Sequence, residues 1–294
     1  MSADRADPVT SPAAHTDQVR RYYDHSSALF ERLGQGGTSI HRAVWGPGVH
    51  TREAAFHYVD ELLLAQLRPL GGRPRVVDLG CGLGASLLYL AARLPVHAEG
   101  ITISARQAER AAALVAAAPP RGDVDVHIRC RQGDYLTLPP DITGMDLAFA
   151  IEAFVHSPDG AGFFRSAARA LRPGGKLILC DDFLSFATPP PAARHRRWLD
   201  EFRDGWRTGT LITTEAAAAL ARAEGLTLVE SQDLTPHLEL RRPRDRAIGA
   251  LLSLLRPLRV RGEYWRGLRG GHALQLALRA GLLQYRVLTF ERQP

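Results

Sequence analysis

The sequence predicts an α/β fold built on a doubly wound, mostly parallel sheet with helices on both faces. Two observations carry this prediction. From Arg75 onward, short apolar runs of strand length alternate with segments of helical periodicity, the pattern of repeated strand–helix units. The first of these strands also runs into a glycine-rich turn that opens a helix, where parallel sheets commonly bind ligands.

The elements follow from the period of the apolar residues. Strands are predicted where four to eight residues are mostly apolar, and helices where apolar residues recur every three or four positions. Ser104 is a suitable N-cap for one helix because its hydroxyl can accept a hydrogen bond from the first turn. The predicted strands are 75–79, 96–101, 124–130, 145–151, 176–182, 226–231 and 282–292, and the helices between them are 85–94, 104–118, 161–171 and 213–224.

The chain divides into three parts. Residues 1–14 lack an apolar period and are expected to be a flexible tail. Residues 15–70 predict a helical front end, in which helices at about 19–30 and 54–67 flank a glycine-rich stretch. The main domain, 71–294, carries inserts at about 183–209 and 241–283, the second expected as helix broken at Pro257 and Gly270-Gly271. Inserts at the carboxyl end of a sheet usually shape a substrate pocket.

Composition excludes several classes of protein. The 294 residues are 45% hydrophobic and 23% charged, as in a globular chain, and no apolar run is long enough to span a bilayer. The first residues have no apolar signal segment, so a cytoplasmic location is expected. The three cysteines are far apart, which points to neither a disulfide framework nor a zinc site. The net charge of +6 comes mainly from arginine, but no module for binding nucleic acid is recognisable.

The strongest motif is VVDLGCGLG at 76–84. A buried strand ends near Asp78, and Gly80, Gly82 and Gly84 then open a helix. Glycines allow the backbone to approach a ligand closely and leave N–H groups at the helix start. The glycine spacing differs from the G-x-G-x-x-G of dinucleotide sites, although a nicotinamide-binding protein remains the alternative at this point.

Together with three further segments, this motif resembles the class I S-adenosylmethionine-dependent methyltransferases. GITIS at 100–104 is similar to the end of their second strand, QGDYLTLP at 132–139 to the loop after their third, and LRPGGKLIL at 171–179 to the turn before their fifth. The resemblance covers about residues 20–185 and implies a Rossmann-like class I fold with an antiparallel last strand. It also implies S-adenosyl-L-methionine as the cofactor.

The resemblance assigns cofactor-binding residues position by position. The glycine loop would surround the methionine part of the cofactor, Asp134 would hold the adenine amino group and Tyr135 would pack on the ring. Thr102 stands at or beside the position where most members carry an acidic residue for the ribose hydroxyls, and Glu99 is nearby. The implied cofactor-binding residues are Asp78, Gly80, Cys81, Gly82, Gly84, Thr102, Gln107, Asp134, Tyr135 and Ile151.

A closer resemblance concerns the substrate. AIEAFVHSPD at 150–159, together with the front end from Arg20 to Trp45, is similar to the sterol, tocopherol and prenyl-diphosphate C-methyltransferase group. This implies methyl transfer to an alkene carbon of an isoprenoid, a reaction of terpenoid secondary metabolism. Such a transfer leaves a carbocation, which needs a negative or π-rich lining and a base that removes a proton.

Three residues are the candidates for catalysis. Glu152 follows the fourth strand at the mouth of the expected pocket and is our candidate for base and cation stabiliser, the alternative being a hydrogen bond to backbone or cofactor. His156 would relay the proton or orient Glu152, or would be an ordinary loop residue. Tyr23 or its neighbour Tyr22 would face the sulfonium from the helical lid that the resemblance implies.

Aromatic residues are candidates for the substrate pocket. His41 and Trp45 would share one face if their segment is helical. Trp198, Phe202 and Trp206 have approximate helical spacing in the first insert, where a stripe of this kind is more often core than cation lining. The expected substrate-binding residues are Tyr22, His41, Trp45, Phe154, Trp198 and Trp206.

Two arginine clusters, at 194–197 and 241–246, would either clamp a diphosphate or form solvated helix faces. Mg²⁺ is expected only if the substrate is a diphosphate, and the residues themselves suggest no metal site. A homo-oligomer is compatible with the sequence. Two rivals stay open: an O- or N-methyltransferase acting on a natural-product scaffold, and a protein of the same fold that no longer transfers methyl groups.

Overall fold

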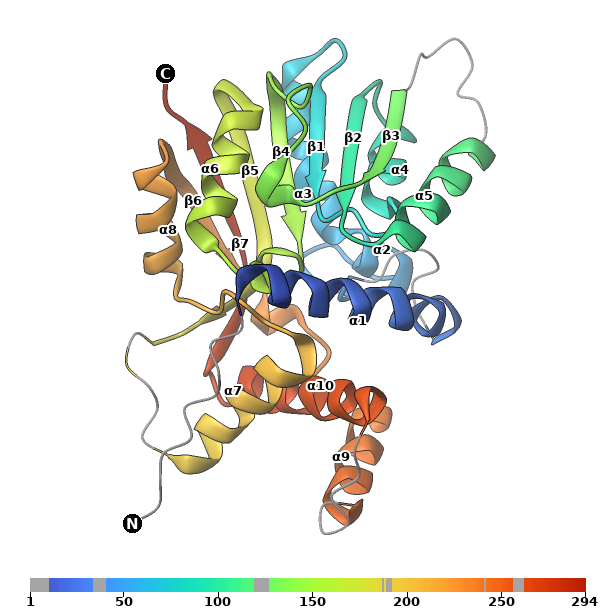
Figure 1. Cartoon of the computed structure of the whole chain (residues 1–294), viewed down its shortest axis with the longest axis vertical. Helices are drawn as coiled ribbons and strands as arrows, with labels where there is room; N and C mark the ends of the chain where they lie inside the picture. Colours follow the sequence, from blue (N-terminus) through green and yellow to red (C-terminus); the bar gives the residue numbers. More distant parts are fainter. Residues whose placement is uncertain are drawn as a thin grey trace.

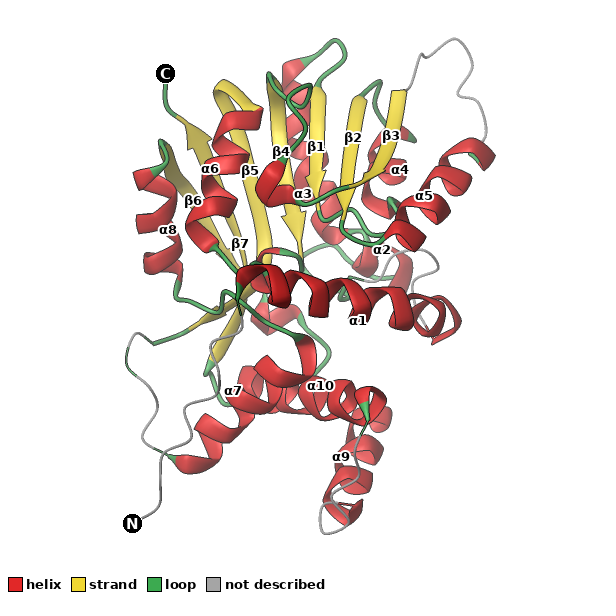
Figure 2. Ribbon diagram, in the orientation of Figure 1, coloured by secondary structure: helices red, strands yellow, loops and turns green. Residues whose placement is uncertain are grey.

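The computed structural model describes residues 11–33, 41–118, 127–186, 188, 192–240, 242–255 and 262–294. A seven-stranded sheet stands at the centre of the main domain, with helices on both of its faces (Figures 1 and 2). The strands are β1 Arg75–Leu79, β2 His97–Thr102, β3 His127–Gln132, β4 Met145–Ile151, β5 Leu171–Leu184, β6 Leu226–Asp233 and β7 Leu283–Arg292. Of the strand expected at 124–130, the first three residues lie outside the described part.

The strand order is β3-β2-β1-β4-β5-β7-β6. Strands β1 to β5 are parallel to their neighbours, and β7 lies antiparallel between β5 and β6. The predicted fold class, with its antiparallel last strand, is therefore confirmed. The order reverses at β1 and β4, and a ligand crevice forms outside the carboxyl ends of strands at such a point. This geometry brings the residues after Leu79 and Ile151 together.

Helices connect and cover the strands. Ser104, Asp159 and Thr213 begin α5, α6 and α8 by accepting hydrogen bonds from backbone N–H groups of the first turn. The helices are α1 Pro12–Leu33, α2 Arg52–Phe56, α3 Tyr58–Leu67, α4 Ala85–Ala91, α5 Ala105–Ala117, α6 Gly160–Ala170, α7 Ala193–Trp206, α8 Thr214–Ala223, α9 Pro243–Leu255 and α10 Glu263–Arg279, with short 3-10 turns η1 Arg68–Leu70, η2 Tyr135–Thr137, η3 Phe154–His156 and η4 Thr235–His237.

The apolar core has two parts. One is rich in aromatic rings, with Phe154 packed on Phe163, Phe164 and Phe183 at centroid distances of 5.0 to 6.3 Å. The other joins Phe149 of the sheet to residues of α3, α4, α7 and α10. Each fully buried side chain of this size contributes about 1.5–3 kcal/mol. The sheet is thus a rigid support for the loops at its carboxyl edge.

The two inserts pack together below the sheet, where α7 and α10 lie side by side with α9 beside them (Figure 1). Gly205 of α7 faces Gly270 of α10, and a Cβ at Gly205 would lie 2.6 Å from the Gly270 Cα. The expected helix break at Gly270-Gly271 is wrong, because α10 runs through both residues. These glycines allow the two helices to approach each other closely. In the sequence, a glycine at such a contact looks the same as a glycine that ends a helix. Pro257 lies outside the described residues.

Other expectations about the front end need correction. Helix α1 begins at Pro12, so it takes up the last residues of the expected tail, and residues 1–10 lie outside the described part. The helix expected at 54–67 is two helices that meet at His57. Residues 41–45 are extended rather than helical, with Val44 bridged to Leu238. Among the helices described, none has the length and apolarity that crossing a bilayer requires.

Candidate active site

A cavity that is open to solvent on one side lies at the carboxyl ends of β1, β2 and β4. Helix α1 runs across this edge of the sheet and closes part of the cavity (Figure 1). Most of the predicted site residues reach its wall, although they come from segments far apart in the sequence. Those lining it are Tyr22, Tyr23, His41, Gly80, Cys81, Gly82, Thr102, Gln107, Asp134, Tyr135, Ile151, Glu152, His156 and Trp206.

The glycine loop after β1 forms one wall. Gly80 has a φ of 130°, and a Cβ there would lie only 2.5 Å from the Cβ of Ala153. Any side chain at this position would therefore displace the loop after β4, where Glu152 stands. The close approach of the two loops brings the backbone to the edge of the cavity, as binding of an extended small molecule requires.

Polar groups for a ribose come from β2 and α5. The Thr102 hydroxyl donates to Gln107 Oε1 at 2.8 Å, which leaves the amide nitrogen of Gln107 as a donor at the cavity wall. Glu99 lies on the other side of β2, where its carboxylate pairs with Arg131 at 3.0 Å. The acidic residue next to the expected ribose position is thus turned away, and Thr102 and Gln107 are the polar side chains that line the cavity there.

The loop after β3 supplies groups for an adenine ring. Asp134 Oδ1 accepts a hydrogen bond from the Leu136 backbone N–H at 2.8 Å, which holds the carboxylate in the loop. Tyr135 is fixed by Phe163, whose ring meets it edge to face at 5.3 Å. The glycine loop, the Thr102–Gln107 pair and this segment are the three places that the sequence resemblance assigns to the parts of S-adenosylmethionine, and all three contribute to the cavity wall.

Several predicted residues lie off the cavity wall. Asp78 is buried beneath the glycine loop, where burial raises the pKa of its carboxyl group well above the usual value. Gly84 begins α4 behind the loop. Of the expected substrate-binding residues, Phe154, Trp45 and Trp198 do not line this cavity. Phe154 is buried in the aromatic part of the core, and Trp198 packs against the other part. The sequence pattern around Phe154 does not show which side of the short 3-10 turn faces the cavity.

Glu152 is the central acidic group of the cavity. Its Oε1 accepts two hydrogen bonds, from the Arg42 backbone N–H and from the Tyr285 hydroxyl, each at 2.9 Å. Its Oε2 lies 3.7 Å from Arg42 Nε, too far for a hydrogen bond. The backbone of Glu152 has a φ of 52°, an uncommon conformation for a residue with a side chain, and such strain gathers at functional sites.

The sequence reasoning missed the residues that hold Glu152. Arg42 donates both terminal nitrogens to Asp182 at 2.8 and 2.5 Å, and its guanidinium lies 4.4 Å from the centre of the Tyr285 ring. Beside them Asp181 accepts from the Val155 and Asp182 backbone N–H groups, while burial raises its pKa to about 8. The DD pair at the end of a strand and the lone tyrosine of the last strand were the available signals.

Tyr23 and His156 form a second polar pair in the cavity. The Tyr23 hydroxyl lies 2.9 Å from His156 Nε2, and His156 Nδ1 lies 3.4 Å from the Arg207 carbonyl. Because a carbonyl only accepts, Nδ1 carries the proton and Nε2 accepts from Tyr23. Burial lowers the pKa of His156 to about 4, so the imidazole is neutral at neutral pH.

Aromatic faces make up much of the remaining wall. Tyr22 meets Tyr23 edge to face at 5.3 Å, and Trp206 reaches the cavity from the end of α7. The arginines of 194–197 are exposed on α7, and none of the described residues of 241–246 lines the cavity. Arg42 is bound to Asp182, so the described part of the cavity presents no cluster of free cations for a diphosphate.

Comparison with known proteins shows which proteins this chain resembles. A family model described as a methyltransferase domain matches residues 76–175. The 27-O-demethylrifamycin SV methyltransferase of Amycolatopsis mediterranei is 34% identical over 62% of this chain and 63% of its own length. Cycloartenol-C-24-methyltransferase 1 of Oryza sativa is 28% identical over 75% of this chain and 62% of its own length.

A solved structure shows the same fold over nearly the whole chain. The cyclopropane synthase MmaA2 from Mycobacterium tuberculosis superposes with a TM-score of 0.75 at 22% identity, covering 98% of this chain and 100% of that protein. The chain spans less than two thirds of the length of the two curated relatives. The fold is the class I methyltransferase fold that the sequence predicted, residues 76–175 match a methyltransferase domain, and sterol and tocopherol methyltransferases are among the similar proteins.

Proposed function

We propose that this chain, in which residues 76–175 form a class I methyltransferase domain, is an S-adenosylmethionine-dependent C-methyltransferase acting on an alkene carbon of an apolar isoprenoid. The observation that carries the proposal is the setting of Glu152. A carboxylate held by two donors stands in a cavity whose wall also carries the aromatic side chains of Tyr22, Tyr23, Tyr135 and Trp206.

This setting matches the charge that develops during alkene methylation. The bound cofactor supplies an electrophilic methyl group, and the protein aligns the double bond and excludes water. The positive charge left on the substrate is then stabilised by the Glu152 carboxylate and by the faces of Tyr22 and Trp206. Glu152 Oε2, which accepts no hydrogen bond from the described residues, takes the proton as the product alkene forms.

We further propose that the substrate carries no diphosphate. The charged groups beside Glu152 are already paired, since Arg42 is bound to Asp182 and Asp181 accepts two backbone hydrogen bonds. Among the described residues that line the cavity there is no arginine or lysine to bind a diphosphate. A terpenoid alcohol or hydrocarbon fits this wall better than a prenyl diphosphate.

A direct test uses S-adenosylmethionine with a radiolabelled methyl group. The protein is incubated with farnesol, with farnesyl diphosphate, and with the diphosphate plus Mg²⁺, and each product is extracted into hexane after phosphatase treatment. The proposal predicts label in the hexane phase from farnesol. If label appeared only with the diphosphate and Mg²⁺, the proposal of C-methylation would stand, but the proposal that the substrate carries no diphosphate would be wrong.

O-methylation of a natural product is the second candidate, and the Tyr23–His156 pair favours it because it offers a tyrosine–histidine dyad beside the cavity. The rifamycin relative named above is an O-methyltransferase. However, an imidazole with a pKa of about 4 is a weak base for a hydroxyl group. O-methylation should accelerate as pH rises and the hydroxyl ionises, whereas alkene methylation should have a flat rate above neutral pH.

A further inference from the structure

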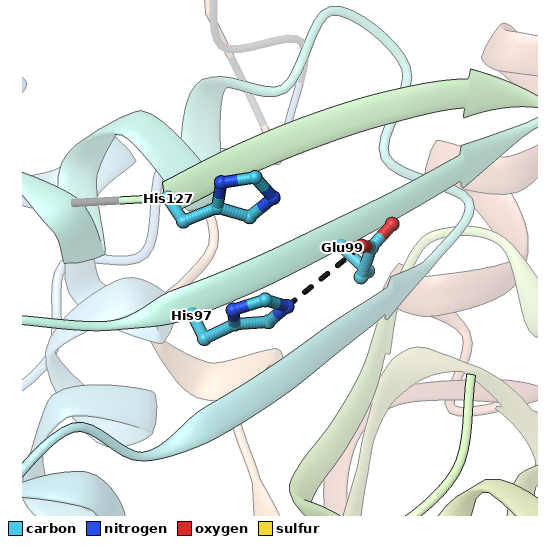
Figure 3. Close-up of side chains that lie close together, drawn as sticks. All are labelled: His97, Glu99 and His127. Atoms are coloured by element: carbon cyan, nitrogen blue, oxygen red, sulfur yellow. Dashed lines mark ion pairs between the residues drawn. The ribbon is translucent and has the colours of Figure 1, made fainter. Parts of the chain in front are cut away.

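A second group of side chains with ligand chemistry lies at the opposite end of the sheet from the cavity. His97 and Glu99 alternate on β2, so they point to the same face, and His127 stands directly beside His97 on β3 (Figure 3). One ligand atom from each residue lies within 4.8 Å of the others. The two imidazole rings stack with centroids 4.7 Å apart.

We propose that His97, Glu99 and His127 form a binding site for one divalent transition-metal ion of the zinc type. Two imidazoles and one carboxylate are the ligands of open zinc sites, in which water supplies the fourth position. His97 Nε2 and Glu99 Oε1 are 3.9 Å apart. Ligands at about 2.1 Å from a tetrahedral zinc ion are separated by about 3.4 Å, so a small rotation of the side chains closes the site.

The carboxylate is already oriented for this role. Arg131 lies 3.0 Å from Glu99 Oε2, and Asp141 in turn lies 3.0 Å from Arg131. The outer oxygen is therefore engaged, while Oε1 faces His97. Partners of this kind fix the geometry of metal ligands. Asp141 also shares the charge of Arg131, so Glu99, Arg131 and Asp141 together remain negative.

The three side chains of this site differ in their exposure to solvent. The Glu99 side chain is 7% exposed and belongs to the sheet, whereas His127 is exposed at the start of the edge strand. An ion can therefore enter from solvent and join a fixed ligand to a more accessible one. Since β3 pairs only with β2 in the sheet, the ion would tie this strand to the core. The site is separate from methyl transfer and does not depend on the proposed substrate.

The test is zinc titration of the full chain after removal of metals with EDTA. Calorimetry should give one Zn²⁺ per chain, and Zn²⁺ should raise the melting temperature. His127→Ala should weaken zinc binding at least tenfold. Glu99→Gln, which keeps a hydrogen-bonding side chain but loses the carboxylate, should also weaken it at least tenfold. His50→Ala, at another exposed histidine, is the matched control and should bind zinc as the parent does.

Substitution of Co²⁺ gives an independent readout, since its visible absorption reports coordination by nitrogen and oxygen ligands. The parent should show this spectrum and His127→Ala should lose it, while circular dichroism confirms that the variant is folded. Equal zinc affinity in the parent and in His127→Ala, or no zinc binding by the parent, would overturn the proposal.

Discussion

The Tyr285 hydroxyl donates a hydrogen bond to Glu152 Oε1 at 2.9 Å, across 133 positions of sequence. Tyr285 is fully buried on β7, the antiparallel strand, and Glu152 follows β4 at the edge of the cavity. The strand that runs against the others therefore fixes the acidic group of the cavity. Through this hydroxyl, the last strand positions the carboxylate that we propose as the base.

Tyr285→Phe tests this link. Phenylalanine keeps the ring but leaves Glu152 without one of its two donors, so the carboxylate should be less well placed and less stabilised. We expect kcat to fall about tenfold, corresponding to about 1.4 kcal/mol, with little change in cofactor affinity. Steady-state kinetics and calorimetric binding of S-adenosylhomocysteine measure the two effects. Tyr264→Phe, at a tyrosine that is 57% exposed, is the control and should be neutral; an unchanged kcat in Tyr285→Phe would contradict the role.

Glu152→Gln tests the proposed base more severely. Glutamine retains the size and a hydrogen-bond acceptor but has neither the negative charge nor the capacity to take a proton. The rate of methyl transfer should fall by about 10²–10⁴-fold while the cofactor still binds. Glu109→Gln, on the exposed face of α5, provides a control of the same chemistry. Retained turnover in Glu152→Gln would remove this residue from the mechanism.

The sequence predicted the sheet well because its strands are short apolar runs bounded by glycine, proline or charge, as at 75–79 and 145–151. It also predicted the cavity wall contributed by loops that follow strands, including Thr102, Asp134 and Glu152, because the carboxyl ends of parallel strands meet at one edge. Such residues are located by their place in a repeating pattern.

Residues that reach the site through long-range packing escaped prediction. Arg42 lies in an extended segment and Tyr285 in the last strand, and only the register of β5 with β7, which pairs Asp182 with Tyr285, brings them together. Helical spacing alone did not separate Trp198, which packs partly buried against the core, from Trp206, which lines the cavity. The local periodicity of apolar residues does not predict how an antiparallel strand is aligned with its neighbour or how two helices pack against each other.

Stability should fall on acidification because of His156. Its pKa in the folded protein is about 4 through burial, against about 6.5 in the unfolded chain, so the unfolded state binds more protons between these values. The free energy of unfolding should decrease by about 2 kcal/mol from pH 7.5 to pH 5 on account of this group alone. Urea denaturation at both pH values measures it. His156→Asn should lose this part of the pH dependence and exposed His50→Asn should keep it; equal slopes in all three proteins would contradict the assignment.

Gly205→Ala tests the packing of the inserts. The new methyl group would meet the Gly270 backbone at 2.6 Å, and backbone cannot move aside as a side chain end can. We expect a loss of about 1–3 kcal/mol in the free energy of unfolding by urea denaturation. Gly267→Ala on α10 meets only Tyr22, at 3.8 Å, and should be neutral or stabilising by up to about 1 kcal/mol. A neutral Gly205→Ala would show that the two helices do not pack this closely.

The bond that the transferred methyl group forms shows whether methyl transfer beside Glu152 goes to carbon. S-adenosylmethionine with a ¹³C-labelled methyl group is incubated with the protein and farnesol, and the extracted product is analysed by carbon NMR. C-methylation predicts a labelled methyl resonance bonded to carbon in the product of the parent protein and none with Glu152→Gln. A methoxy resonance from the parent protein would instead identify an O-methyltransferase and contradict the proposed chemistry.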